Sequence, residues 1–151
     1  DAFKQGLLEK DFVAVVRYQG PKSNGMPELH GLLPALGVLQ DKGFNVAIVT
    51  DGRMSGASGK VPSAIHLVSE AAQGGVISTI EDGDIICLDV ENGELTLEVD
   101  SDVLQKRTYA KANLNKNQYN CGRELFSSIR YCISDAEQGA SIFDLPGKEK
   151  S

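Results

Sequence analysis

The chain has 151 residues, of which 41% are hydrophobic and 24% charged, a composition typical of one globular domain with a sizeable core. Its net charge of −6 argues against a general nucleic-acid-binding or membrane-binding surface, although a local basic pocket is compatible with it. No apolar run approaches the roughly 20 residues of a membrane span and no signal peptide is visible, so we expect a cytoplasmic protein with no membrane partner.

The first half of the chain predicts a strand, a helical connection and a second strand. The apolar run at 12–16 predicts a buried strand. Pro27 is placed to begin a helix with Glu28 in its first turn, and the leucines that follow recur at helical spacing until Pro34 kinks or breaks the helix. Residues 45–50 predict a second strand, parallel to the first in a right-handed βαβ unit.

The second half predicts an antiparallel arrangement. Residues 64–68 suggest a short strand, and residues 69–72 a brief helical turn. Asp-Gly and Asn-Gly pairs then mark hairpin turns between three runs that predict a meander, at 76–80, 84–90 and 94–99.

A polar loop at 110–119 is followed by a helical pattern at 122–133. That helix should be amphipathic, with one apolar face made of Leu125, Phe126, Ile129 and Ile133. Together these elements predict one mixed α/β domain over residues 1–151, in which a parallel βαβ unit and an antiparallel meander share a helical layer.

Three cysteines, Cys87, Cys121 and Cys132, are spaced too widely for a metal-binding or cluster-binding motif. Their odd number does not suit a disulfide framework. We therefore expect buried or partly buried free thiols in a reducing compartment.

Two glycine-rich loops, at 20–28 and 51–60, follow the two parallel strands. Both must emerge at the carboxyl edge of the sheet, where α/β folds bind ligands, and glycines let backbone N–H groups approach an anion. The second loop lacks the spacing of a phosphate-binding Walker motif. It contributes Ser55, a hydroxyl that a neighbour could activate, and Lys60, a positive charge; an ordinary glycine-rich connection is the alternative.

Two routes could activate Ser55. A serine–histidine–aspartate triad would need His30 or His66, the only two histidines, and neither lies in the same loop. The other route is a hard cation such as Mg²⁺, for which Glu28 could supply one oxygen ligand, with partners from Asp51 or from outside the chain. Glu28 would otherwise be a plain carboxylate at a helix N-terminus.

Lys22 and Lys60 have two interpretations. They could jointly hold a phosphate or carboxylate beside the glycine-rich loops, or they could be solvated surface charges.

These loops resemble the C-terminal domain of the dihydroxyacid/phosphogluconate dehydratase family. The most specific matches are Gly-Arg-Met-Ser-Gly at 52–56 and Gly-Met-Pro-Glu at 25–28. The similarity covers most of 12–143 and is carried by VVRYQGPKSNGMPELH (15–30), AIVTDGRMSGASGKVPSAIH (47–66), EAAQGGVISTIEDGDII (70–86), GRELF (122–126) and AEQGA (136–140).

The resemblance implies a swivelling β/β/α-type domain and a dehydration that turns a 2,3-dihydroxy acid into a 2-keto-3-deoxy acid. In this family an iron–sulfur cluster, expected here as 4Fe–4S, acts as Lewis acid on the departing hydroxyl, while Mg²⁺ holds the substrate. The serine that matches Ser55 is the proposed base, and the glutamate that matches Glu28 is a Mg²⁺ ligand. The cluster cysteines lie in an N-terminal domain, so we expect this chain to be a fragment that is inactive alone.

Within the family the chain is most similar to the enzymes that dehydrate 6-phosphogluconate in the Entner–Doudoroff pathway, which are expected to be homodimers. Dihydroxyacid dehydratases usually lack the Ser-Gly-Lys-Val-Pro-Ser-Ala stretch found at 58–64, and usually have Met-Arg-Glu where Met-Pro-Glu stands at 26–28. We therefore expect substrate contacts from Gly52, Gly56, Ser58, Gly59 and Lys60, the last three near the phosphate. Alternatives are a dehydratase domain for a dihydroxyacid or another sugar acid, and a non-catalytic swivelling module that binds an anion.

Overall fold

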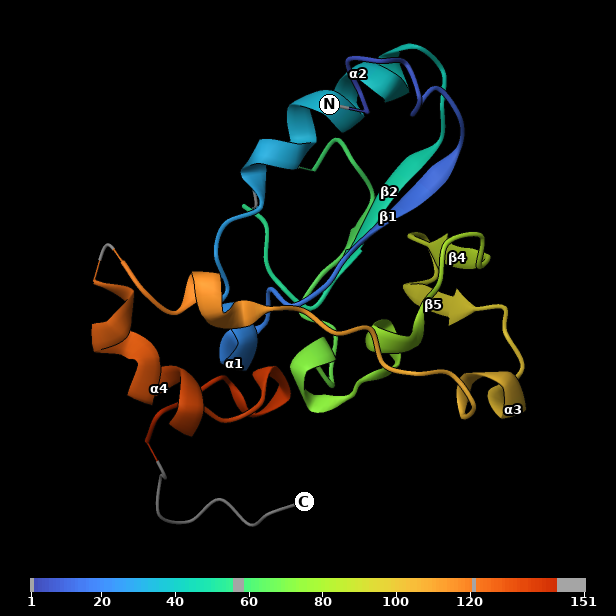
Figure 1. Ribbon diagram of the computed structural model, residues 1–151. Helices are drawn as coiled ribbons and strands as arrows, with labels where there is room; N and C mark the ends of the chain where they lie inside the picture. The colour runs from blue at the N-terminus through green and yellow to red at the C-terminus, as the bar shows by residue number, and fades with distance from the viewer. Residues whose placement is uncertain (1, 56–58, 121, 144–151) are drawn as a thin grey trace.

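The computed structural model describes residues 2–55, 59–120 and 122–143 (Figure 1). Its strands and α-helices are, in chain order, β1 (Phe12–Val16), α1 (Pro21–Asn24), α2 (Leu33–Asp41), β2 (Val46–Thr50), β3 (Ser63–Ala64), β4 (Ile86–Asp89), β5 (Glu94–Leu97), α3 (Ser101–Leu104) and α4 (Ser127–Cys132). Short 3₁₀ helices occupy His30–Leu32, Ala71–Gln73, Val76–Thr79, Leu114–Asn117, Arg123–Phe126 and Ala136–Gln138.

The first sheet is parallel, with strand order β1-β2-β3, which confirms the predicted βαβ unit and the α/β class. Phe12 of β1 pairs with Val46 of β2, and the register continues to Val16 and Thr50. Both strands are apolar on both sides because both faces of the sheet are covered.

Alternate residues of each strand feed two hydrophobic clusters. Val46 and Ile48 pack with the buried leucines of α2 on one face, and Val49 packs with Ala71 and Ile77 on the other. The helix α2 lies over the first face in Figure 1. Because successive strand residues point to opposite faces, one short sequence supplies both clusters.

The second sheet is a two-stranded hairpin rather than the predicted three-stranded meander, since β4 pairs antiparallel with β5 and residues 76–79 form a 3₁₀ helix. The Oγ atoms of Ser78 and Thr79 donate to the carbonyls of Gly75 and Val76, at 2.6 and 2.8 Å. Such local bonds offer the backbone an alternative to a sheet ladder, which explains the error.

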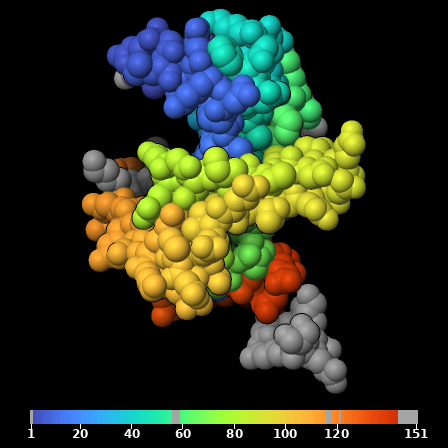
Figure 2. Space-filling model, turned by 90° about the vertical axis from the view of Figure 1, so that its right-hand side faces the viewer, coloured from blue at the N-terminus to red at the C-terminus, as the bar shows by residue number. Residues whose placement is uncertain are grey.

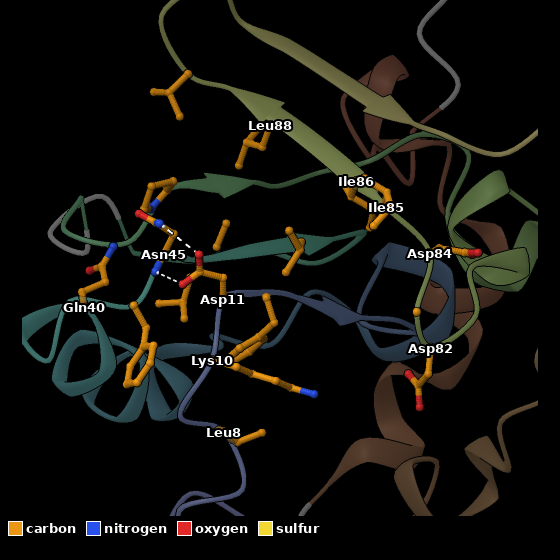
Figure 3. A pocket seen from close by; sticks show the side chains of 18 of the residues that line it. Leu8, Lys10, Asp11, Gln40, Asn45, Asp82, Asp84, Ile85, Ile86 and Leu88 are labelled. Atoms are coloured by element: carbon orange, nitrogen blue, oxygen red, sulfur yellow. Dashed lines mark hydrogen bonds between the residues drawn. The ribbon is translucent and has the colours of Figure 1, made fainter.

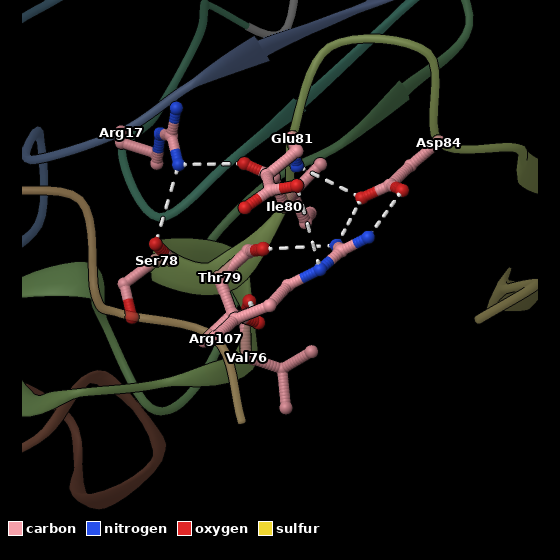
Figure 4. Close-up of polar contacts among 8 residues, drawn as sticks. All are labelled: Arg17, Val76, Ser78, Thr79, Ile80, Glu81, Asp84 and Arg107. Carbon is pink, nitrogen blue, oxygen red and sulfur yellow. Dashed lines mark hydrogen bonds and ion pairs between the residues drawn. The ribbon is translucent and has the colours of Figure 1, made fainter. Parts of the chain in front are cut away.

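Two arginines fasten the segment before this hairpin (Figure 4). Arg107 makes a two-pronged ion pair with Asp84, at 2.6 and 2.9 Å, and donates to the carbonyl of Thr79. Arg17, one residue beyond β1, donates to the carbonyls of Ser78 and Ile80. The hairpin entrance is thereby attached to the parallel sheet by charge-assisted hydrogen bonds.

The prediction for the connecting helix was partly wrong. Pro27 lies outside any helix, and α2 begins only at Leu33, after a 3₁₀ turn at His30–Leu32. Pro34 therefore occupies the first turn of α2, where its missing N–H costs nothing, instead of kinking a longer helix. Residues 26–29 lie outside any helix, and Glu28 forms an isolated bridge with Arg53.

The predicted amphipathic helix at 122–133 is divided into a 3₁₀ turn and α4, and its burial differs from that expected. Leu125 is 75% exposed and Phe126 52% exposed, whereas Arg130 is only 7% exposed. Ile129 and Ile133, the other two residues of the predicted apolar face, are partly buried, so the prediction holds for only half of that face.

Cys87 and Cys132 are free thiols, as predicted, but they are exposed rather than buried; Cys121 lies outside the described residues. Within the described ranges no helix combines the length and hydrophobicity needed to cross a bilayer.

Candidate functional site

The two glycine-rich loops meet beside the carboxyl ends of β1 and β2, as the topology predicts. Glu28 and Arg53 form an isolated parallel bridge, and the N–H of Leu29 donates to the carbonyl of Arg53 at 3.3 Å. The Arg53 side chain strengthens this junction: Nη1 lies 2.9 Å from Glu28 Oε2, and Nε donates to the carbonyl of Met26 at 2.7 Å. A pairing of backbones and charges thus holds the loops together.

Ser55 and Glu28, the two residues on which the predicted chemistry depends, are in contact. The backbone N–H of Ser55 donates to Glu28 Oε1 at 2.8 Å, while the other carboxylate oxygen accepts from Arg53. Ser55 and Glu28 are both exposed, so both face the surface at the loop junction. The arrangement presents a hydroxyl-bearing residue beside a carboxylate and a guanidinium.

A fully buried carboxylate, Asp51, organises the junction from below. Its Oδ1 accepts from the N–H of Gln19 at 2.9 Å, and its Oδ2 accepts from those of Tyr18 and Ala71, at 3.1 and 2.9 Å. Asp51 was expected only as a possible metal partner, but its oxygens instead accept from three backbone N–H groups in two segments, at 18–19 and at 71. The role of Asp51 could have been suspected from the sequence, because an acidic residue stands directly after a buried strand.

A second buried acid, Glu70, was not predicted. Its carboxylate accepts from the N–H groups of Lys22 and Ser23, at 2.9 and 3.1 Å, and from Ser23 Oγ at 2.9 Å, and so caps α1. A Cβ at Gly20 would lie 2.2 Å from Glu70 Oε2, which explains the glycine at that position. No local pattern connects residues almost fifty positions apart.

The glycines and the serine predicted to contact the substrate differ in where they lie. Gly52 lies close under the first loop, because a Cβ there would be 2.5 Å from Cβ of Gln19. The backbone of His66 joins the same place, donating to the carbonyl of Gly52 at 2.9 Å. Gly59 is described and exposed, whereas Gly56 and Ser58 lie outside the described residues.

Lys60 extends away from the loop junction. Its Nζ lies 2.6 Å from Oδ1 of Asp41 at the end of α2, and both side chains are more than half exposed. Its predicted contact with substrate stays a prediction.

The described residues do not by themselves make a magnesium site. Among them, no group of three or more His, Cys, Asp or Glu side chains lies close enough to hold a metal ion. Glu28 contributes one carboxylate, and Mg²⁺ requires near-octahedral oxygen coordination. A Mg²⁺ ion at Glu28 would therefore need further ligands from outside the described residues.

Basic residues gather where the first loop turns at the end of α1. Arg123 Nη2 donates to the backbone carbonyl and to Oδ1 of Asn24, at 3.2 and 2.5 Å, and Arg130 packs against Gly25. Lys22 pairs with Asp135 at 2.6 Å, and this contact, with a further bond from Gln73, lowers the pKa of Asp135. In Figure 1 α4 lies beside α1.

A cleft of about 1080 Å³ lies elsewhere, at the amino ends of β1 and β2 (Figure 3). Its polar wall includes Asp11, whose carboxylate accepts from the backbone and side-chain N–H groups of Asn45; these bonds lower the pKa of Asp11. Figure 2 shows the yellow-green residues that follow 80 crossing the face below the N-terminal segment. None of the predicted site residues lines this cleft.

Comparison with known proteins identifies related chains. Residues 1–140 match the family described as dihydroxy-acid/6-phosphogluconate dehydratase C-terminal. The chain is 58% identical over 142 residues to a phosphogluconate dehydratase of Pseudomonas aeruginosa, and 55% identical over 141 residues to one of Rhizobium meliloti. These alignments cover 94% and 93% of this chain but 23% of each relative, so the chain spans about a quarter of the length of these relatives.

Proposed function

Because the chain belongs to the dihydroxy-acid/6-phosphogluconate dehydratase family, through its C-terminal domain, we propose that it forms part of the active site of a phosphogluconate dehydratase. The enzyme would be a hydro-lyase that converts 6-phosphogluconate to 2-keto-3-deoxy-6-phosphogluconate in gluconate metabolism. The observation that carries this proposal is the junction of Ser55 with Glu28, 2.8 Å apart from N to Oε1.

In this proposal Ser55 is the base. Its Oγ takes the proton from C2 of the substrate while the bond from C3 to its hydroxyl breaks, and the resulting enol becomes the 2-keto acid. A serine hydroxyl is a very weak acid, so it must be deprotonated with help from nearby positive charge. The bond from the Ser55 N–H to Glu28 fixes the backbone that carries the hydroxyl, and the guanidinium of Arg53 donates to the same carboxylate.

The remaining parts of the catalytic site belong to the rest of the protein. A 4Fe–4S cluster in an N-terminal domain would supply Lewis acidity for the departing hydroxyl, and Glu28 would give one oxygen ligand to Mg²⁺. The enzyme would be a cytoplasmic homodimer, and this chain alone would be inactive.

The glycine-rich loop 51–60 would face the substrate. Gly52, Gly56 and Gly59 would allow close approach, while Ser58 and Lys60 would contact the phosphate. Lys60 would first have to leave Asp41, and the cost is small because an exposed ion pair contributes about 0–1 kcal/mol.

Replacing Ser55 by Ala in the full-length enzyme tests the proposal. We expect kcat for 6-phosphogluconate to fall at least about 100-fold with little change in KM, because a general base acts mainly in the transition state. Ser127→Ala is the matched control, since Ser127 is also exposed and its hydroxyl only donates to the carbonyl of Glu124. Equal activities of the two variants would favour a non-catalytic module.

A further inference from the structure

Arg130 is a buried cation without a buried counter-charge. It is 7% exposed, and no described carboxylate lies within ion-pair distance of it. Its Nη2 donates to two neutral acceptors, Gln118 Oε1 at 2.9 Å and the carbonyl of Arg123 at 3.1 Å. Its Nε is buried and has no hydrogen-bond partner among the residues that the structure describes.

Burying an unpaired guanidinium lowers the stability of the folded protein. Arginine keeps its charge at any pH the protein meets, so Arg130 cannot relieve the cost by losing a proton. Buried charges in proteins are normally paired, and a buried donor without an acceptor carries a further penalty. A bound anion would remove both costs.

We propose that Arg130, together with Arg123, binds the phosphate group of the substrate. This rests on the proposed function, because it assumes that the substrate is a phosphorylated sugar acid. Guanidinium groups match phosphate oxygens with paired, charge-assisted hydrogen bonds, and a dianionic phosphate offers enough acceptor oxygens for two arginines.

The location fits one end of an extended substrate. Arg130 lies against Gly25, and Arg123 binds the adjacent Asn24. Gly25 precedes Glu28 by three residues, and a chain of three residues spans at most about 10 Å. A phosphorylated six-carbon acid with its C2 near Ser55 could therefore reach the two arginines along the first loop.

The two lysines predicted to hold an anion are already paired. Lys22 binds Asp135, and Lys60 binds Asp41, each at 2.6 Å. Either would have to give up a carboxylate to take the phosphate, whereas Arg130 gives up none. The structure therefore points to Arg130 as an anchor additional to the predicted Lys60.

The test compares substrates with and without the phosphate. In the full-length enzyme, Arg130→Lys and Arg123→Gln should lower kcat/KM for 6-phosphogluconate about 10- to 100-fold, the range for charge-assisted hydrogen bonds. Turnover of gluconate, which lacks the phosphate, should change less than about threefold. Lys42→Ala is the control. Lys42 follows the last residue of α2, and its exposed side chain pairs with Glu9.

Two outcomes would overturn the proposal: equal losses on both substrates, which would mean that the arginines are only structural, and no loss on either. Titration of the folded full-length protein with inorganic phosphate provides a readout that is independent of turnover. Wild-type protein should bind phosphate more tightly than either variant, even if it dehydrates neither substrate; in that case the proposed reaction fails while the anion site stands. Equal phosphate binding by all three proteins would refute the site.

Discussion

Replacing Asp51 by Asn should loosen the candidate site and the core together. The side chain of Asp51 is fully buried and accepts from the N–H groups of Tyr18, Gln19 and Ala71, with donor–acceptor distances of 2.9 to 3.1 Å. An asparagine has nearly the same shape but only one acceptor oxygen. In its better orientation that oxygen keeps the two bonds of Oδ2, and its NH₂ group then faces the N–H of Gln19.

The expected loss follows from these bonds. One buried N–H becomes unsatisfied, at about 1–3 kcal/mol, and the two remaining bonds change from charge-assisted to neutral, at about 1 kcal/mol each. A neutral amide also avoids the desolvation penalty of a buried charge, and this offsets part of the loss. We therefore expect a net decrease of about 2–4 kcal/mol in the free energy of unfolding.

Urea denaturation of the 151-residue chain measures that loss. Asp41→Asn is the matched control, because Asp41 is exposed and its ion pair with Lys60 should contribute less than about 1 kcal/mol. Hydrogen exchange adds a local readout: the amides of Tyr18, Gln19 and Ala71 should exchange faster in the Asp51 variant than global unfolding alone explains. If Asp51→Asn were no more destabilising than Asp41→Asn, the claim that this carboxylate joins the loops would be refuted.

Three further predictions concern other contacts. Arg107 is the main reason why the pKa of Asp84 falls to about 2, with help from the N–H of Glu81. The folded-state value lies below the unfolded one, so this stabilisation is complete above about pH 4 and lost as the pH falls toward 2. Urea unfolding of Asp84→Asn should lack that part of the acid dependence; an unchanged pH profile would contradict it. Gly20→Ala should cost about 1–3 kcal/mol in urea unfolding, because the new Cβ displaces Glu70 from its cap, whereas Gly31→Ala, with open space around it, should not. In the full-length enzyme, Arg53→Met should lower kcat about 10- to 100-fold because Glu28 is misplaced, and Arg53→Lys should recover part of the activity. The ion pair is part-exposed, so the free energy of unfolding should change by less than about 1 kcal/mol. A larger change in that free energy would indicate a structural role.

The sequence was informative where local pattern and tertiary structure agree. The apolar runs at 12–16 and 45–50 do form β1 and β2, although β1 is only partly buried whereas β2 is mostly buried. The Asn92-Gly93 pair does lie between β4 and β5. The meeting of the two glycine-rich loops followed from the parallel topology alone, because carboxyl ends of neighbouring parallel strands share one edge.

The errors arose where distant partners decide the local structure. Leucine spacing suggested a helix from Pro27, but Glu28 pairs with Arg53 instead and the helix begins only at Leu33. The burial of Arg130 in place of Leu125 depends on how α4 packs on α1, which no helical periodicity encodes. Glu70 binds backbone N–H groups some 47 residues away, and such contacts leave no spacing to detect. The swivelling arrangement involves a second domain and stays a prediction.

The register of the parallel sheet determines when, during synthesis of the chain, its strands can pair. Each residue of β1 pairs with one 34 positions later, so the apolar Phe12–Val16 segment is made well before its partner strand exists. An unpaired apolar strand is a template for aggregation, which makes this interval the vulnerable one for a nascent chain. The last hydrogen bond to Asp51 comes from Ala71. A ribosome-bound chain could therefore pair its first two strands and still lack a settled loop junction until residue 71 has emerged.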